Sequence, residues 1–297
     1  MEKTKPPLSD AAESTKDYSD IGIVIQGPLV SRGRTGVSAQ VKRRNVTEEH
    51  ITDYECLENV ERLYADFKDF GRMVCMVWAD EPEDLVEDLR TRIGPENVFV
   101  IEDTTKAIKP KKGVLPGNNK YRQFLSSLKG VELLENGGCP YAIKIRSDQY
   151  LDLYKLADDL KTIASLRAHF LMVPRIHVGT SSDHLADFFI GGHTKDLQKC
   201  FSAYLSAPEL YRSVHTDIFY RWAYTLLGPP KLRPRMFGLK LNKNYILKAW
   251  NSLYCPARLS TFKTLIWRGD APLVDARKTK FLEDLPPDLK VGPSLLT

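Results

Sequence analysis

A chain of 297 residues, 42% hydrophobic and 27% charged, can fold around a sizeable core as one large domain or two small ones. Its net charge of +5 is too modest to indicate a nucleic-acid partner. No apolar run reaches the length of a membrane span, and residues 1–20 lack the apolar core of a signal peptide. We therefore expect a soluble, cytoplasmic protein, for which a peripheral contact with a membrane surface stays open.

The cysteine and charge patterns narrow the possible classes of protein further. The five cysteines are scattered and form no Cys-x-x-Cys or Cys/His cluster, which favours reduced thiols in the cytosol and argues against a structural zinc site. No acidic residue lies between Asp217 and Asp270, an interval that holds ten Lys or Arg. A solvated face is the commoner meaning of such a run, and a surface for a polyanion or an anionic membrane is the alternative.

The chain begins with a polar segment and a short apolar run. Residues 1–20 have too little apolar content to pack, so we expect a mobile arm. Residues 21–25 predict a buried strand that ends at the turn Gln26-Gly27-Pro28. The loop at 31–36 carries neither the GxGxxG nor the GxxxxGK[ST] fingerprint, which argues against a Rossmann dinucleotide site and a P-loop.

Strand and helix patterns then alternate along the chain. The expected helices lie at 56–70, 82–92, 121–131, 153–166, 195–205 and 214–226, and the further strands at 73–78, 97–101, 141–145 and 170–174. Such alternation predicts right-handed βαβ units and a mainly parallel sheet. We expect one α/β domain over residues 21–270, followed by a C-terminal tail, 271–297, that is loose or wraps the surface.

The strand at 141–145 runs directly into a cation, a hydroxyl and a carboxylate, Arg146-Ser147-Asp148. In parallel α/β sheets, ligands bind just beyond the carboxyl ends of the strands. Asp148 is therefore expected to face a ligand site, with Lys144 and Arg146 close enough to offset its charge or to bind an anion. The alternative is a buried strand end without a ligand, although charges at alternate strand positions are costly to bury without partners.

Several segments together resemble one family. They are Gln26-Gly27-Pro28, Val77-Trp78-Ala79-Asp80, Asn118-Asn119 with Arg122-Gln123 and Ser126, the Lys144–Asp148 stretch, Asp187-Phe188 with Gly191, and Asp217. With these pieces, spread over residues 21–225, the chain resembles the WavE-type bacterial polysaccharide glycosyltransferases, whose fold is similar to the GT-A nucleotide-sugar fold. The resemblance implies a GT-A-like, Rossmann-type mixed and mainly parallel sheet flanked by helices. It also implies a nucleotide-sugar donor and a glycan or lipid-linked saccharide as acceptor.

The resemblance assigns donor binding to one set of residues: Gln26, Gly27, Pro28, Arg122, Gln123, Lys144, Arg146 and Asp148. GT-A enzymes usually carry Asp-x-Asp after the fourth strand, where it holds a divalent cation on the donor diphosphate. Here that place reads Arg146-Ser147-Asp148, with one carboxylate. Because Mg²⁺ or Mn²⁺ needs carboxylate oxygens besides those of the phosphates, a metal ion at Asp148 is a hypothesis that this departure puts in doubt.

Two flanking features have both a functional and a purely structural interpretation. Arg122 and Gln123 lie in the first turn of a predicted helix, where an Arg could bind phosphate, but a solvated helix face is the alternative. Trp78 is more often a core aromatic residue than a platform for a nucleobase.

Two carboxylates are candidates for the catalytic residues. Asp217 lies in an otherwise apolar helical segment, where partial desolvation would raise its pKa and favour a role as general base. Its alternative is an ion pair with Arg221, four residues further on. Asp187 opens an apolar run next to glycines, which suits contact with a sugar acceptor, or else it is a turn carboxylate. We favour Asp217 as the base and Asp187 as the acceptor-binding residue.

Two other functions stay open. A nucleotidyltransferase would bind a similar nucleotide and usually has a basic, Gly-rich loop after the first strand, with which Gly33-Arg34-Thr35-Gly36 is compatible. A non-enzymatic polyanion-binding module would use the basic C-terminal half, and its binding would fall steeply with salt and need no nucleotide.

Overall fold

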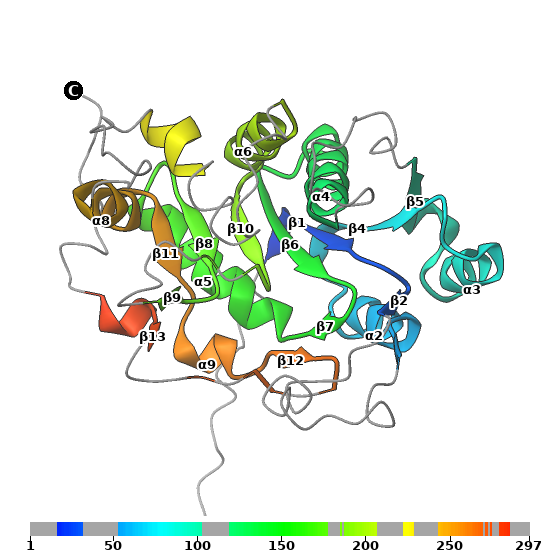
Figure 1. Cartoon of the computed structure of the whole chain (residues 1–297). Helices are drawn as coiled ribbons and strands as arrows, with labels where there is room; N and C mark the ends of the chain where they lie inside the picture. Colours follow the sequence, from blue (N-terminus) through cyan, green and yellow to red (C-terminus); the bar gives the residue numbers. More distant parts are fainter. Residues whose placement is uncertain are drawn as a thin grey trace, which may run out of the picture.

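The structure is a computed structural model that describes residues 17–31, 53–102, 119–177, 185, 187–206, 222–228, 243–269, 271–272, 274 and 279–285. Its centre is a seven-stranded sheet in the order β11-β8-β10-β6-β1-β4-β5 (Figure 1). Along the chain these strands are β1 (Tyr18–Gln26), β4 (Phe70–Trp78), β5 (Val98–Ile101), β6 (Tyr141–Arg146), β8 (Leu171–Val173), β10 (Ile190–His193) and β11 (Tyr254–Pro256). Strand β10 runs antiparallel to both neighbours, and the other neighbouring pairs are parallel.

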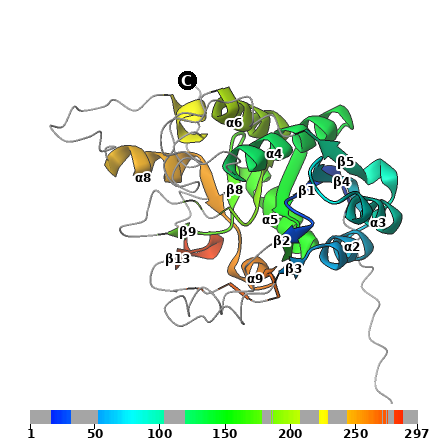
Figure 2. The same cartoon turned by 45° about the vertical axis from the view of Figure 1, so that its right-hand side comes forward.

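Helices cover both faces of this sheet (Figures 1 and 2). On one face pack α2 (Leu57–Asp66), α3 (Glu83–Ile93) and α5 (Leu153–Leu166), and on the other α4 (Asn119–Asn136), α6 (Thr194–Ser206) and α8 (Lys243–Ser252). Consecutive residues of β1 alternate between the two cores, since Ile23 and Ile25 belong to the first and Val24 to the second. The predicted α/β fold, with a mixed, mainly parallel sheet flanked by helices, is confirmed.

The remaining elements are short. They are β2 (Val30–Ser31), β3 (Tyr54–Glu55), β7 (Gln149–Tyr150), β9 (Ile176–His177), α9 (Leu259–Phe262), β12 (Ile266–Trp267) and β13 (Thr279–Lys280), with 3₁₀ turns η2 (Pro95–Asn97) and η4 (Leu282–Asp284). Six of them form three two-stranded pairs, namely β2 with β3, β12 with β7 and β13 with β9. The last two pairs tie the C-terminal part of the chain to its middle.

Local sequence explains where α5 begins and why α4 lies close to the sheet. Helix α5 starts after Asp152, whose side chain accepts a hydrogen bond from the backbone N–H of Lys155 at 3.1 Å, a typical N-cap. Helix α4 lies directly against β1 because residue 130 is glycine, where a Cβ atom would collide with the side chain of Val24. This close approach brings the first turns of α4 to the carboxyl edge of the sheet, where the hydroxyl of Ser126 lies 3.2 Å from Oε1 of Gln26.

The packed domain extends past the predicted limits at both ends. Strand β1 begins at Tyr18, inside the range expected to be a mobile arm, because the buried Tyr18 ring stacks on Phe70 with centroids 5.5 Å apart. Within the expected tail, Thr279 and Lys280 form β13, and the buried Phe281 packs against Phe262 at a centroid distance of 5.5 Å. Burial of these aromatic rings explains both extensions.

All five cysteines are buried and free, compatible with the predicted reduced thiols. Among the described residues, no helix combines the length and apolar character that crossing a membrane requires.

Candidate functional site

The candidate site lies at the carboxyl ends of β1 and β6, two parallel neighbours in the middle of the sheet. From β1 the chain continues to β4 and β5 on one side and then crosses to β6 on the other. Open α/β sheets bind their ligands at such a reversal of strand order. Gln26 ends β1 and is paired in register with Arg146, the last residue of β6. The fold thus brings together two donor-site candidates that are far apart in the sequence.

The turns after β1 and β6 are fastened to each other. The Ser147 hydroxyl donates to the backbone oxygen of Pro28 at 2.8 Å. Gly27 has φ 144°, and a Cβ atom there would collide with the Ser147 hydroxyl. Asn59 of α2 donates to the backbone oxygens of Ser147 and Gln149 at 2.7 and 2.6 Å. Because residue 27 is glycine, there is room for the turn at Ser147, and Asn59 holds that turn in place.

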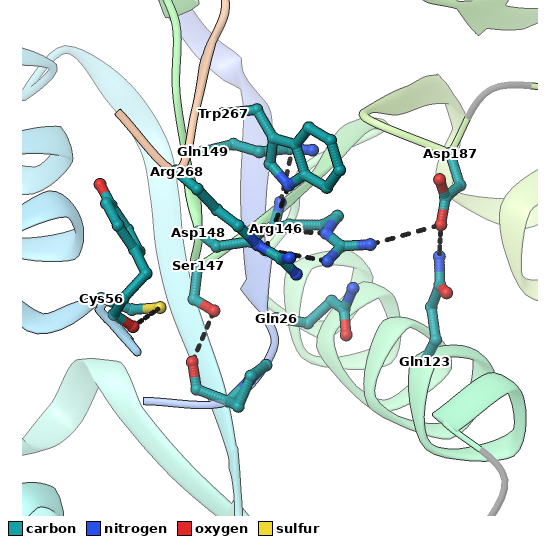
Figure 3. Close-up of polar contacts among 12 residues, drawn as sticks. Gln26, Cys56, Gln123, Arg146, Ser147, Asp148, Gln149, Asp187, Trp267 and Arg268 are labelled. Atoms are coloured by element: carbon teal, nitrogen blue, oxygen red, sulfur yellow. Dashed lines mark hydrogen bonds and ion pairs between the residues drawn. The ribbon is translucent and has the colours of Figure 1, made fainter. Parts of the chain in front are cut away.

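Asp148 is a buried hub of charged hydrogen bonds, with 1% of its side chain exposed. Arg146 binds it in a two-pronged contact, Nε to Oδ1 and Nη2 to Oδ2, both at 2.9 Å (Figure 3). Arg268 Nε and Trp267 Nε1 also donate to Oδ2, at 2.7 and 3.2 Å. Burial alone would raise the pKa of Asp148, but the charges and hydrogen bonds of Arg146 and Arg268 outweigh it and lower the pKa to about 2. Asp148 is therefore ionised at any ordinary pH.

Asp187 lies on the other side of Arg146 and is also held by several groups (Figure 3). Its Oδ2 accepts a hydrogen bond from Gln123 of α4 at 3.2 Å and lies 3.6 Å from Nη1 of Arg146. The buried Lys144 donates from Nζ to the backbone oxygen of Asp187 at 3.2 Å. Burial lowers the pKa of Lys144 to about 8, although the nearby Asp187 favours the charged form. Arg146 thus bridges two carboxylates, and Lys144 contacts the backbone of one of them.

We refer to Lys144, Arg146, Asp148, Asp187 and Arg268 as the arginine–carboxylate cluster. Three cationic side chains in it face two carboxylates, so with Lys144 charged the cluster has a surplus of one positive charge. Of the five, Arg146 is the most exposed, with 24% of its side chain accessible, against 7% for Arg268. A rigid, mostly buried cation with one open edge is suited to binding an anion such as a diphosphate.

Arg122 lies on the flank of the site and contacts residues at the end of β4. Its Nη2 donates to Asp80 Oδ2 at 2.6 Å, and its guanidinium lies 5.0 Å from the ring centre of the buried Trp78. Charge and ring stacking therefore fix Arg122 beside the strand end. Trp78 packs as a core aromatic residue with this cation over its face.

Some predicted features lie outside the described residues. They are Asp217, the Gly33–Gly36 loop, Asn118 and residues 229–242 of the acid-free basic interval. The roles assigned to them stay predictions from the sequence.

Sequence reasoning missed three residues of the site: Asn59, Trp267 and Arg268. Asn59 is a buried amide on the apolar face of α2, and this break in the hydrophobic pattern was the signal for it. Trp267 and Arg268 lie more than a hundred residues after Asp148 in the acid-free interval, and β12 carries them to β7 beside the site. The signal for Arg268 was the run of cations without local acids, because any cation of that run that becomes buried needs a carboxylate from another segment.

The arrangement does not fit a divalent cation at Asp148. Both carboxylate oxygens already accept hydrogen bonds from Arg146, and Oδ2 also accepts from Trp267 and Arg268. A metal ion there would be placed against two guanidinium charges. Among the described residues, no group of three or more His, Cys, Asp or Glu side chains could hold a metal ion.

No family model matches the chain, and no curated protein matches its sequence. Among solved structures, the 4-diphosphocytidyl-2C-methyl-D-erythritol synthase of Anaerococcus prevotii is 13% identical, with a TM-score of 0.39 over 77% of this chain and 95% of that one. The mannose-1-phosphate geranyltransferase of Thermus thermophilus is 9% identical, with a TM-score of 0.33 over 67% of each chain. Identities and scores this low do not carry either activity over to this chain.

Proposed function

We propose that this protein is a glycosyltransferase of the WavE type, which moves a sugar from a nucleotide-sugar donor to a polysaccharide or glycolipid acceptor. The observation that carries the proposal is Arg146, a partly exposed guanidinium held between Asp148 and Asp187 where the strand order reverses. That is the place where an open α/β sheet binds its ligand, and a diphosphate matches the charge and the planar donors of an arginine.

In the proposed reaction, an acceptor hydroxyl oxygen attacks the anomeric carbon of the donor sugar. The bond from that carbon to the diphosphate oxygen breaks, and its electron pair leaves with the nucleoside diphosphate. Arg146 stabilises the negative charge that develops on the leaving group, and a carboxylate takes the proton of the acceptor hydroxyl. Gln26, Arg122 and Gln123 border the donor, while Lys144 and Asp148 act through Asp187 and Arg146.

The test of donor binding is calorimetry with UDP, GDP, CDP and ADP, each with and without EDTA. We expect at least one of them to bind with millimolar or tighter affinity. Turnover of the matching nucleotide sugar should survive chelation at least in part, because arginine charge stands where a metal ion would bind. Failure of all four nucleotides to bind would refute the donor site. Complete loss of turnover in EDTA with rescue by Mn²⁺ would refute the metal-independent mechanism.

Asp217→Asn is expected to lower turnover by about 10²-fold or more, on the scale of losing a general base, with donor binding intact. Asp187→Asn should mainly raise the acceptor KM, because the Asp187 carboxylate is already engaged by Gln123 and Arg146 and is less available to take a proton. Steady-state kinetics with varied acceptor measures both. The reverse pattern would exchange the two roles, and an unfolded Asp217→Asn protein would assign that residue to structure.

A nucleotidyltransferase is the second candidate, favoured by the basic Gly33-Arg34-Thr35-Gly36 segment after the first strand. The two reactions release different products, a nucleoside diphosphate from a nucleotide sugar or pyrophosphate from a nucleoside triphosphate. Product analysis with both kinds of substrate therefore separates them. A polyanion-binding module would instead bind heparin in a steeply salt-dependent way and turn over neither substrate.

A further inference from the structure

A C-terminal segment, residues 258–268, is tied to the middle of the chain at several points, and we call it the C-terminal strap. At its start, the Arg258 backbone N–H and Nη1 donate to the buried Asp159 of α5 at 2.9 and 2.7 Å. At its end, β12 pairs with β7, and the Arg268 backbone N–H donates to the Asp148 backbone oxygen at 3.0 Å. The strap therefore ends at the turn that carries Asp148.

Side chains of the strap complete the surroundings of Asp148. Arg268 and Trp267 both donate to Asp148 Oδ2, and the Trp267 ring packs edge-on against Phe188 with centroids 5.6 Å apart. The Arg268 guanidinium lies 4.8 Å from the Trp267 ring centre. Because Phe188 follows Asp187, the strap contacts both segments between which Arg146 is held.

The backbone at Arg268 has an unusual conformation. Its φ of 51° is the one positive value at a non-glycine residue in the described part of the chain. A side chain makes this left-handed region unfavourable, so such residues persist where their surroundings determine them strongly. Here the backbone bond to Asp148 and the side-chain bond to its carboxylate do so.

Charge gives Arg268 a second role. Asp148 by itself would neutralise most of the charge of Arg146, with which it forms a two-pronged ion pair. Arg268 binds the same carboxylate from a buried position, and its charge restores the surplus. Since Arg268 is almost fully buried, it affects a bound anion through Asp148 and Arg146 and not by direct contact.

We propose that Arg268 is a positioning residue, which holds Asp148 so that Arg146 is oriented and left with enough positive charge to bind the diphosphate of the ligand. This inference rests on the proposed function for the identity of that ligand. The inference assigns the C-terminal strap to the donor site, although the strap lies outside the segments that resemble the glycosyltransferase family.

The test uses the full chain and inorganic pyrophosphate as the probe, with affinities from calorimetry and folding followed by thermal unfolding. Arg268→Gln is expected to weaken pyrophosphate binding about tenfold or more, on the scale of losing an outer partner that orients a binding group. Arg268→Lys, which keeps the charge, should recover most of this affinity. Lys263→Gln removes the same charge from an exposed position on the same strap and is the matched control, expected to change affinity less than about twofold.

Unchanged pyrophosphate affinity in a folded Arg268→Gln protein would overturn the inference, as would the same loss in Lys263→Gln or no binding by the wild-type chain. If Arg268→Gln does not fold, Trp267→Phe takes its place. It keeps a ring against Phe188 but removes one hydrogen bond to Asp148, and unchanged affinity in it would overturn the inference. Nucleotide binding that is independent of Arg268 would refute this inference alone, whereas Arg268-dependent pyrophosphate binding without nucleotide binding would refute the proposed function alone.

Discussion

Replacing Arg146 by methionine is expected to lower turnover by about 10²- to 10³-fold, the scale seen when one donor that stabilises a developing negative charge is removed. It should also lower the free energy of unfolding by about 3 kcal/mol, because the buried Asp148 carboxylate loses its two-pronged partner. Steady-state kinetics and urea unfolding measure the two effects. Acid unfolding measures a third effect. The ionised Asp148 stabilises the folded protein above its ordinary pKa of 3.8, and this stabilisation is lost as the pH falls towards 2. Without Arg146, burial raises the folded-state pKa of Asp148 back towards its ordinary value or above it, so this loss of stability in acid should shrink.

A double variant separates stability from chemistry at this position. Arg146→Met combined with Asp148→Asn removes the buried carboxylate that would lose its two-pronged partner, while the amide oxygen of Asn can still accept from Arg268 and Trp267. We expect stability to recover in part, because Arg268 and Asp187 each still lack one charged partner, and turnover to stay low. Arg62→Met removes an exposed arginine, paired with Asp66 on α2, and should change neither quantity much. Recovery of turnover in the double variant would mean that Arg146 serves only to neutralise Asp148.

Replacing Lys144 by methionine is expected to change how stability depends on pH between 8 and 10. Burial lowers the folded-state pKa of Lys144 to about 8, against 10.5 when unfolded. In this window the unfolded chain binds more protons than the folded one, so the free energy of unfolding rises with pH. The Lys144 contribution should amount to about 2–3 kcal/mol by pH 10. Methionine has no proton to lose, so this part of the rise should vanish in the variant.

The measurement is urea unfolding of both proteins at pH 7, 8, 9 and 10, taking the difference between them at each pH. Other groups that titrate in this range are common to both proteins and cancel in the difference. Three charged groups act on Lys144, namely Asp187, Arg146 and Asp148, and all three are present in both proteins. A constant difference across the series would show that Lys144 is hydrated in the folded protein and keeps its ordinary pKa.

Local patterns in the sequence determined most of the secondary structure. Apolar residues at helical spacing indicated α2, α3, α4, α5 and α6, and short apolar runs indicated β1, β4, β5, β6 and β8. Alternation of these elements predicted a mainly parallel sheet, because parallel strands need a crossover between them. It could not predict the direction of β10, a four-residue strand with two glycines, or its position between β6 and β8. Pairing with neighbours distant in sequence decides both.

The sequence also determined that the end of β6 is charged and lies where such sheets bind ligands, since Lys144, Arg146 and Asp148 are adjacent in it. Only the tertiary structure decided how these charges are used. Asp148 appeared available to a ligand or a metal ion, but Arg268, a hundred and twenty residues later, binds it and buries it. A buried carboxylate is stable only with partners, and those partners come from whichever segments the fold brings beside it. Neither spacing nor composition predicts the contact between Arg268 and Asp148. The exposure of Arg146 and the position of Arg268 behind it could therefore be seen only in the tertiary structure.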